Sequence, residues 1–256
     1  MRAYGAAPEV VTCLTRVAAA LGLSLVTACS SGGKGAAGSP GGASPTPTGT
    51  GDDSDGATAP PVITNPDGFA YPSPPFGRNA RSGSTPGSRM QNFAYLGYPN
   101  GDPSRGLQTI AMLDYYDPCG KRYKLIHLSV AAVWCTPCNQ ETAAVVAALA
   151  DLDAEQVVML QALDDGPTVN VGATQHDLDL WIARYHPAFS EVLDPGLIHL
   201  GGFFPAAEVP WNCDIDPRTM EIIDQSTGWS DVTTELSPAL AAVQGPPAYP
   251  LSVSCN

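Results

Sequence analysis

The chain has 256 residues, of which 25 are acidic and 12 are lysine or arginine, so its formal net charge is −13 at pH 7. A surface with this charge repels nucleic acid and anionic lipid head groups, and we expect neither to be a partner. The length excludes a large multidomain assembly and suits one domain with a proper core.

The first 28 residues have the parts of an export signal. Arginines lie in a polar leader, and the apolar run over 17–28 is too short to span a bilayer as a stable helix. The pattern Val26-Thr27-Ala28-Cys29 resembles a bacterial lipobox, in which the cysteine is diacylated and becomes the new N-terminus. We therefore expect residues 1–28 to be removed as a lipoprotein signal peptide. A lipid on Cys29 would anchor the exported chain to a membrane of the cell envelope, facing the periplasm or the cell exterior. An ordinary signal, with Cys29 incidental, is the alternative.

The signal is followed by a segment with little capacity to form a core. Gly, Ser, Ala, Thr, Pro and Asp make up nearly all of residues 30–61, and the bias continues to about residue 89. This composition is typical of a flexible tether. We predict a linker over 29–89 and a compact domain over 90–256.

In the domain, predicted strands alternate with predicted helices. β-Branched and apolar runs predict strands at 91–98, 107–116, 125–133, 156–163, 191–193, 211–215 and 220–224. Helices are predicted over 139–152, over 174–185 with Thr174 as its cap, and over 237–243 with Ser237 as its cap and Pro238 at its first position. This order implies an α/β fold, a mixed sheet flanked by helices on both faces.

Two cysteines stand one helical turn apart where the central strand passes into the first helix, in the sequence Trp134-Cys135-Thr136-Pro137-Cys138. A cysteine at a helix N-terminus faces unpaired backbone N–H groups and the positive end of the helix dipole, and both stabilise its thiolate. We therefore predict that Cys135 is the attacking thiolate and that Cys138 resolves the mixed disulfide.

Two structural alternatives for this pair stay open. A permanent disulfide is one, although a loop this short constrains the unfolded chain little. Half of a zinc site is the other, although no second pair of ligands occurs at matched spacing. Three further cysteines would remain in the exported domain, where an oxidising compartment favours disulfides. We predict a bridge between Cys213 and Cys255 that leaves Cys119 unpaired, although spacing alone does not fix the connectivity.

The W-C-x-P-C motif after an apolar strand, the order of the elements and Val209-Pro210 before a hairpin strand resemble the thioredoxin superfamily. The likeness is greatest to its membrane-tethered TlpA-like or redoxin branch of exported thiol-disulfide oxidoreductases, and it covers residues 93–243. It implies an active site formed by Trp134, Cys135, Pro137 and Cys138. It also implies that Pro210, with Val209, is the cis-proline that faces the disulfide and helps to bind substrate backbone.

The same resemblance implies the partners and the direction of the reaction. Protein thiols or disulfides and an electron donor would be the partners, and no organic cofactor or metal is required. Proline before the second cysteine resembles reductants, which favours reduction of protein disulfides. Many thioredoxins carry an acid six positions before the first cysteine, where this chain has Ser129. Proton transfer would then rely on water or on another carboxylate such as Glu141.

Other functions were weighed against this hypothesis. A binding lipoprotein that keeps the fold without redox activity is the main competitor. A copper chaperone, with His199 joining the two cysteines, is disfavoured because such chaperones carry three residues between their cysteines. A peroxidase would need a threonine and a proline that are absent before Cys135. His127, on the central strand, is interpreted as a partly buried, hydrogen-bonded histidine.

Overall fold

The computed structural model describes residues 63–72, 84–204, 208–228, 231–247, 251 and 253–255. The predicted signal peptide over 1–28, the predicted lipidation site Cys29 and the linker up to residue 62 lie outside these residues. In the described residues, no helix is both long enough and apolar enough to cross a membrane.

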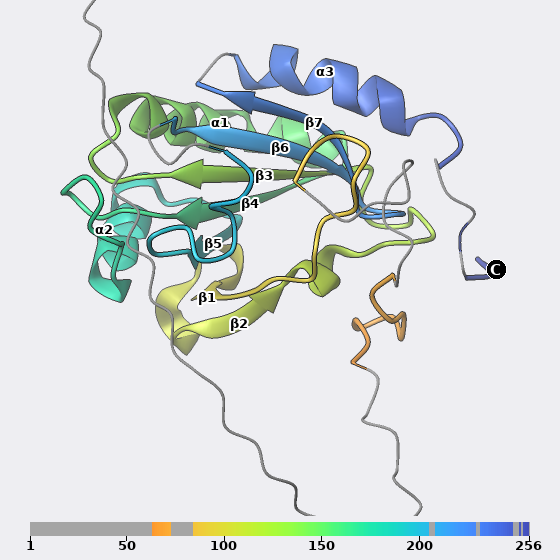
Figure 1. The fold of residues 1–256 in the computed structure, drawn as a ribbon, viewed down its shortest axis with the longest axis horizontal. Helices are drawn as coiled ribbons and strands as arrows, with labels where there is room; N and C mark the ends of the chain where they lie inside the picture. Colours follow the sequence, from red (N-terminus) through yellow and green to blue (C-terminus); the bar gives the residue numbers. More distant parts are fainter. Residues whose placement is uncertain are drawn as a thin grey trace, which may run out of the picture. The chain divides into compact units, whose positions relative to one another are not determined.

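A mixed sheet of seven strands forms the centre of the described domain (Figure 1). The strands lie in the order β2-β1-β5-β4-β3-β6-β7, with β3, β4 and β5 parallel to one another and the other pairs antiparallel. Their bounds are Ala94–Tyr98 (β1), Gln108–Ala111 (β2), Leu125–Ala131 (β3), Val157–Leu163 (β4), Ser190–Leu193 (β5), Trp211–Asp216 (β6) and Glu221–Thr227 (β7). Every residue of β3 is buried, as its apolar run predicts.

Three α-helices accompany the sheet in the part of the chain that the structure describes. They span Thr136–Ala154 (α1), Gln175–Tyr185 (α2) and Val232–Val243 (α3), and short 3-10 helices span Pro99–Gly101, Pro103–Arg105 and Met112–Tyr115. Thr174 caps α2 as predicted, because its hydroxyl accepts from the backbone of Asp177 and the Asp177 carboxylate accepts from the backbone of Thr174.

The predicted start of the last helix is wrong. α3 begins at Val232, where Asp231 is the N-cap and accepts a hydrogen bond from the backbone N–H of Thr234. Ser237 and Pro238 therefore lie inside the helix. The Ser237 hydroxyl donates to the carbonyl oxygen of Thr233 one turn earlier instead of capping a new helix.

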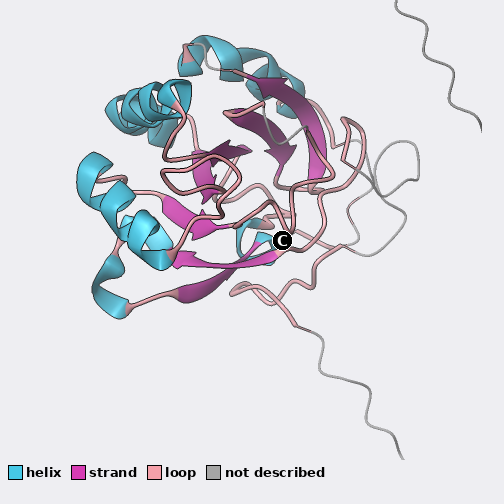
Figure 2. Cartoon of the chain, turned by 60° about the vertical axis from the view of Figure 1, so that its left-hand side comes forward, coloured by secondary structure: helices cyan, strands magenta, loops and turns pink. Residues whose placement is uncertain are grey.

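The described α-helices gather on one side of the sheet (Figure 2). Oγ1 of Thr142 on α1 and Nε1 of Trp181 on α2 both lie within hydrogen-bond distance of Oε1 of Gln161 on β4, at 3.1 and 3.0 Å. α3 packs in one cluster with the side chains of α1 and with Met159, which points the same way as Gln161.

The opposite face of the sheet carries a 3-10 helix and irregular segments, and no α-helix of the described residues lies on it. The mixed sheet flanked by helices is confirmed, but the prediction of α-helices on both faces is wrong for this part of the chain. The core cluster on this face takes side chains from the 3-10 helix Met112–Tyr115, from residues 197–204 and from the segment before β1. Residues 197–204 form turns, because Gly201 and Gly202 disfavour a helix and Asp194 accepts hydrogen bonds from the backbone of His199 and Leu200.

Two segments that precede Met90 also contact the domain. Residues 87–90 lie beside β7 and exchange backbone hydrogen bonds of 2.8 to 2.9 Å with Met220 and Ile222. Asn65 is buried, and its Nδ2 donates to the carbonyl oxygen of Tyr116 at 2.8 Å. These contacts extend the folded unit beyond the start that composition indicates.

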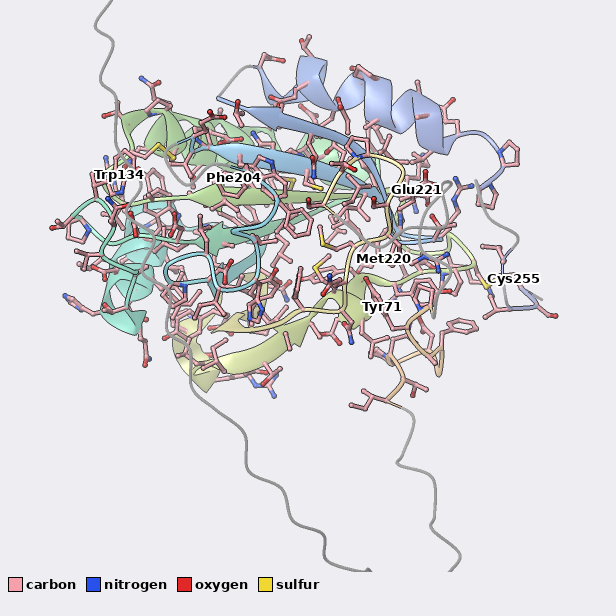
Figure 3. The ribbon with its side chains drawn as sticks, viewed as in Figure 1. Tyr71, Trp134, Phe204, Met220, Glu221 and Cys255 are labelled. Atoms are coloured by element: carbon pink, nitrogen blue, oxygen red, sulfur yellow. A yellow bond between two sulfur atoms is a disulfide. The ribbon has the colours of Figure 1, made fainter. Side chains whose placement is uncertain are left out.

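The chain forms a long-range disulfide between Cys119 and Cys255, and Cys213 is a buried free thiol. The predicted pairing of Cys213 with Cys255 is therefore wrong. Cys213 lies on β6 in the same core cluster as the 3-10 helix Met112–Tyr115, whereas Cys255 lies near the carbonyl oxygen of Pro118. Figure 3 shows Cys255 at the end of the domain away from Trp134.

Candidate redox site

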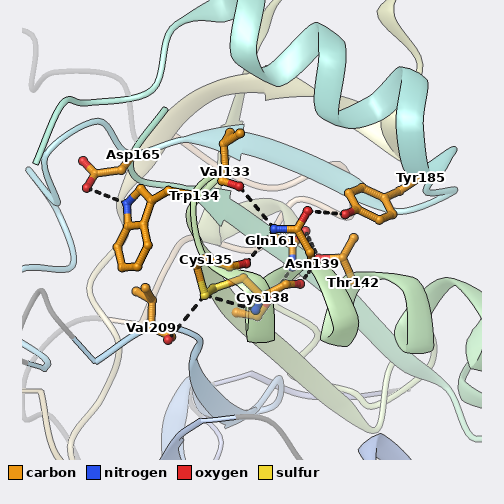
Figure 4. Close-up of a disulfide and its surroundings, with 11 residues drawn as sticks. Val133, Trp134, Cys135, Cys138, Asn139, Thr142, Gln161, Asp165, Tyr185 and Val209 are labelled. Atoms are coloured by element: carbon orange, nitrogen blue, oxygen red, sulfur yellow. Dashed lines mark hydrogen bonds between the residues drawn. A yellow bond between two sulfur atoms is a disulfide. The ribbon is translucent and has the colours of Figure 1, made fainter. Parts of the chain in front are cut away.

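The two cysteines of the motif lie at the start of α1 and form a disulfide (Figure 4). β3 ends at Ala131, a short turn follows, and Cys135 is the N-cap of α1. Its Sγ accepts a hydrogen bond from the backbone N–H of Cys138 at 3.1 Å. A sulfur in this position is stabilised as an anion by the helix N-terminus. The geometry therefore suits a thiolate at Cys135 once the disulfide is reduced.

Pro137 fits the first turn of α1 without cost. An N–H group in the first turn has no intrahelical acceptor, so the missing donor of proline removes no helical hydrogen bond. Pro137 also fixes the backbone between the two cysteines.

The dipeptide Val209-Pro210 lies against the disulfide. Its peptide bond is cis, and the carbonyl oxygen of Val209 is 3.5 Å from Sγ of Cys135. The structure thus brings together two segments that are about 70 positions apart in the chain. They contain the residues predicted for the site: Trp134, Cys135, Pro137, Cys138, Val209 and Pro210.

Both cysteines are buried in the disulfide state. Cys135 is 1% exposed and Cys138 is fully buried. Beside them lies the indole of Trp134, whose Nε1 donates to Oδ2 of Asp165 at 3.1 Å (Figure 4). The same oxygen accepts from the backbone N–H of Asn170 at 2.6 Å. An incoming sulfur can reach Cys135 only after one of the surrounding groups moves.

A hydrogen-bonded side chain ties the motif to α2. Nδ2 of Asn139 donates to the carbonyl oxygens of Cys135 and Val133, at 2.6 and 3.2 Å. Its Oδ1 accepts from the hydroxyl of Tyr185 at 2.5 Å. No sequence pattern marks Asn139 or Tyr185 as part of the site. The one signal for Asp165 is its place in an acidic pair directly after the predicted strand 156–163.

The side chain that replaces the usual acid below the cysteines is neutral, as the sequence predicts. Ser129 is buried on β3, and its Oγ accepts from Nε2 of Gln161 at 3.1 Å. Neither side chain titrates near neutral pH. Proton exchange with Cys138 therefore needs another group.

Glu141 is a titratable group close to Cys138 in the sequence of α1. It follows Cys138 by three residues on the sheet-facing side of the helix and is 3% exposed. Burial raises the pKa of Glu141 to about 7, against the opposing effects of the His127 charge and of the Asn212 amide. Glu141 can therefore gain or lose a proton near neutral pH.

The two histidines that the sequence offered as candidate site residues, His127 and His199, do not contact the disulfide. His127 is more deeply buried than predicted, with 1% exposure, and its Nδ1 is 2.7 Å from Oδ1 of Asp214. His199 packs against the rings of Phe93 and Tyr95. Within the described part of the chain, no group of three or more His, Cys, Asp or Glu side chains is placed to hold a metal ion.

The strand order, the CxxC disulfide at the start of the helix after a central strand, and the cis-proline loop beside its sulfur define a thioredoxin-like fold with a dithiol site. The strand order, the disulfide and the cis-proline loop that the sequence resemblance implies are thus present in the fold.

Comparisons with known proteins find only distant similarities. No protein-family model and no curated protein matches the chain. One similar structure is a putative thiol:disulfide interchange protein DsbE from Chlorobium tepidum, with 19% identity and a TM-score of 0.48, covering 64% of this chain and 100% of that chain. Another is the thioredoxin domain of a thiol-disulfide oxidoreductase from Bacteroides vulgatus, with 12% identity and a TM-score of 0.45, covering 60% of this chain and 97% of that chain. A third is a secreted thiol-disulfide isomerase from Corynebacterium glutamicum, with 15% identity and a TM-score of 0.46, covering 62% of this chain and 88% of that chain. These similarities are too low to transfer a function.

Proposed function

We propose that the protein is an extracytoplasmic thiol-disulfide oxidoreductase that reduces disulfides of client polypeptides through Cys135 and Cys138. The observation that carries this proposal is the position of Cys135 Sγ at the N-cap of α1, within hydrogen-bond distance of the Cys138 N–H and beside the Val209 carbonyl. A permanent structural disulfide would not need a sulfur placed where its thiolate is stabilised.

In the reducing direction, the thiolate of Cys135 attacks one sulfur of the client disulfide. The client S–S bond breaks, its second sulfur leaves as a thiolate that takes a proton from water, and Cys135 is held in a mixed disulfide. Cys138 then gives its proton to the Glu141 carboxylate, and its thiolate attacks Sγ of Cys135. The bond between Cys135 and the client breaks, the client sulfur leaves as a thiolate that takes a proton from water, and the disulfide of the protein re-forms while the client leaves as a dithiol. Two electrons pass to the client, so an external dithiol must reduce the pair before the next cycle.

Apolar surface beside the site supports a polypeptide client. Val133, which precedes Trp134, lines a shallow groove together with Pro167, Leu180 and Trp181. Leu180 is 56% exposed, and Val169 and Val171 on the neighbouring loop are 53% and 54% exposed. Clustered exposed apolar side chains are typical of a binding surface.

The export signal, the lipobox-like Cys29 and the second disulfide support a location outside the cytoplasm. Cys119–Cys255 closes a long loop, and such bonds persist in oxidising compartments. We propose that a lipid on Cys29 holds the domain at a membrane. Mass spectrometry of the mature N-terminus tests this: a diacylated Cys29 is expected, and an unmodified start downstream of Cys29 would exclude the anchor.

Insulin reduction by the exported domain with dithiothreitol as electron donor tests the activity. Cys135→Ser should abolish turnover, because no other sulfur occupies the N-cap. Cys138→Ser should accumulate a mixed disulfide on Cys135, visible on a non-reducing gel, because the resolving thiol is missing. Cys213→Ala, which changes a buried thiol outside the site, is the matched control and should keep the rate. Equal rates for Cys135→Ser and the wild type would overturn the proposal.

The burial of both cysteines favours a second candidate, a redox-inactive binding lipoprotein with this fold. The two functions differ in how the pair responds to reductant. The oxidoreductase requires that millimolar dithiothreitol opens Cys135–Cys138 in the folded protein, as counted by alkylation and mass spectrometry. A pair that stays closed until the protein unfolds would support the binding function.

A further inference from the structure

A charged cluster is buried between the sheet and α1. His127 on β3 lies directly opposite Asp214 on β6, and Nδ1 of the histidine is 2.7 Å from Oδ1 of the aspartate. The two side chains are 2% and 7% exposed. Glu141 faces this pair from α1 and interacts electrostatically with His127. The cluster thus connects the middle of the sheet with the helix that carries Cys138.

Two buried polar atoms of this cluster have no hydrogen-bond partner among the described residues. They are Nε2 of His127 and Oε2 of Glu141. Buried polar atoms are normally paired, and an exception calls for a functional or structural reason. A proton that moves on and off Glu141 would change what these atoms can bind.

The charges that face His127 are all negative. Asp214 approaches from β6, Glu141 from α1 and Glu235 from α3, where Glu235 is hydrogen-bonded to Ser226 of β7; Asp224 of β7 acts on Asp214. Burial lowers the pKa of His127, but the hydrogen bond to Asp214 and these surrounding charges outweigh it, and the pKa is raised. These surroundings therefore favour the imidazolium form of His127, which carries positive charge beside Asp214 and Glu141.

We propose that His127, held by Asp214, is a positioning residue that keeps Glu141 able to ionise and so sets the pH range in which Glu141 can take the proton of Cys138. The proposal rests on the proposed redox function. A buried carboxyl far from any positive charge stays protonated, and a protonated carboxyl cannot accept a proton. The imidazolium opposes this by stabilising the carboxylate of Glu141.

The pH dependence of the resolving step tests the proposal. Cys135 is converted to a mixed disulfide with thionitrobenzoate, and release of the coloured thiol reports the attack by Cys138. His127→Gln should move the midpoint of the rate–pH profile to higher pH by about one unit or more, because an opposite charge at close range is removed. The limiting rate at high pH should be retained, which a merely structural role does not predict.

Variants in three other positions make the test specific. Asp214→Asn should shift the midpoint in the same direction, because a histidine without its carboxylate partner is less often protonated. His176→Gln, an exposed histidine on α2, is the matched control and should not shift it. In the Glu141→Gln background, His127→Gln should have no further effect on the midpoint.

Each result has a defined meaning. An unchanged midpoint in folded His127→Gln, or a shift that persists in the Glu141→Gln background, would overturn the role of His127. The loss of activity in Cys135→Ser would still support the oxidoreductase, so the two proposals fail separately. If His127→Gln does not fold, carbon NMR of the Glu141 carboxyl in the wild type decides: ionisation near neutral pH is expected, and a carboxyl still protonated at about pH 9 would contradict the proposal.

Discussion

The hydroxyl of Tyr185 donates to Oδ1 of Asn139, and the amide of Asn139 donates to the carbonyl oxygen of Cys135 (Figure 4). Two side chains thus connect α2 with the residue that caps α1. The link holds the turn that carries the disulfide, because the carbonyl of Val133 is bound by the same amide.

Tyr185→Phe should lower the free energy of unfolding by about 1 kcal/mol, the net value of one hydrogen bond in a partly buried site. Chemical denaturation measures the loss. Asn139→Ala should cost more, since two carbonyl oxygens then lose a donor. In the Asn139→Ala background, Tyr185→Phe should cost less than in the wild type, and equal costs would contradict the coupling.

Asp165→Ala should speed reduction of Cys135–Cys138 by a small thiol. The carboxylate holds the indole of Trp134 and the backbone of Asn170, and both lose their acceptor in the variant. Without this hydrogen bond the Trp134 side chain is more mobile, so the sulfur of Cys135 is exposed to solvent more often. Stopped-flow reduction with dithiothreitol measures the rate, with Asp153→Ala on the exposed face of α1 as the control. A rate equal to that of the wild type would show that other groups limit access.

The stability of the oxidised protein should depend on the ionisation of Glu141. Burial raises its pKa in the folded state to about 7, compared with about 4.3 for an unfolded glutamate, so the folded state binds more protons between these values. The free energy of unfolding should therefore fall as the pH rises from about 4 to about 7 and then level off. In Glu141→Gln, the fall in the free energy of unfolding between these pH values should be smaller by an amount on the order of 3 kcal/mol. Denaturation curves at several pH values measure it, and parallel curves for the two proteins would contradict the assignment.

Loss of the Cys119–Cys255 bond should reduce stability strongly. The bond joins residues 136 positions apart, and a long closed loop restricts the unfolded chain most. Cys255→Ser should lower the free energy of unfolding by about 2 to 5 kcal/mol. Cys213→Ala breaks no covalent bond and should cost less. If Cys255→Ser matched the wild type in thermal unfolding, the bond would not constrain the chain as the structure indicates.

Local signals predicted the elements around the redox motif well. The buried run of β3, the helix after Cys135 and the capping residue Thr174 each depend on neighbours in the sequence, and each lies where it was expected. The approach of Val209 to Cys135 came from the family resemblance instead, because no local pattern joins residues so far apart.

Features that depend on competition between segments were not predictable. Ser237 followed by Pro238 is a good helix start, yet α3 begins one and a half turns earlier. There the side chain of Asp231 accepts a hydrogen bond from the backbone N–H of Thr234. Cys213 and Cys119 are equally plausible partners for Cys255 until β6 places Cys213 in the core. No local pattern indicated that the loop after Asp194 would be held by this side chain, whose carboxylate accepts from the consecutive backbone N–H groups of His199 and Leu200.

The two disulfides of the described residues differ in how much chain each one closes. The one at Cys135 spans three positions, and the one at Cys255 spans 136. Reducing the first sets free almost no chain entropy, while the second keeps the far end of the domain fastened. Opening the bond at Cys135 would therefore leave the covalent link between residues 119 and 255 in place.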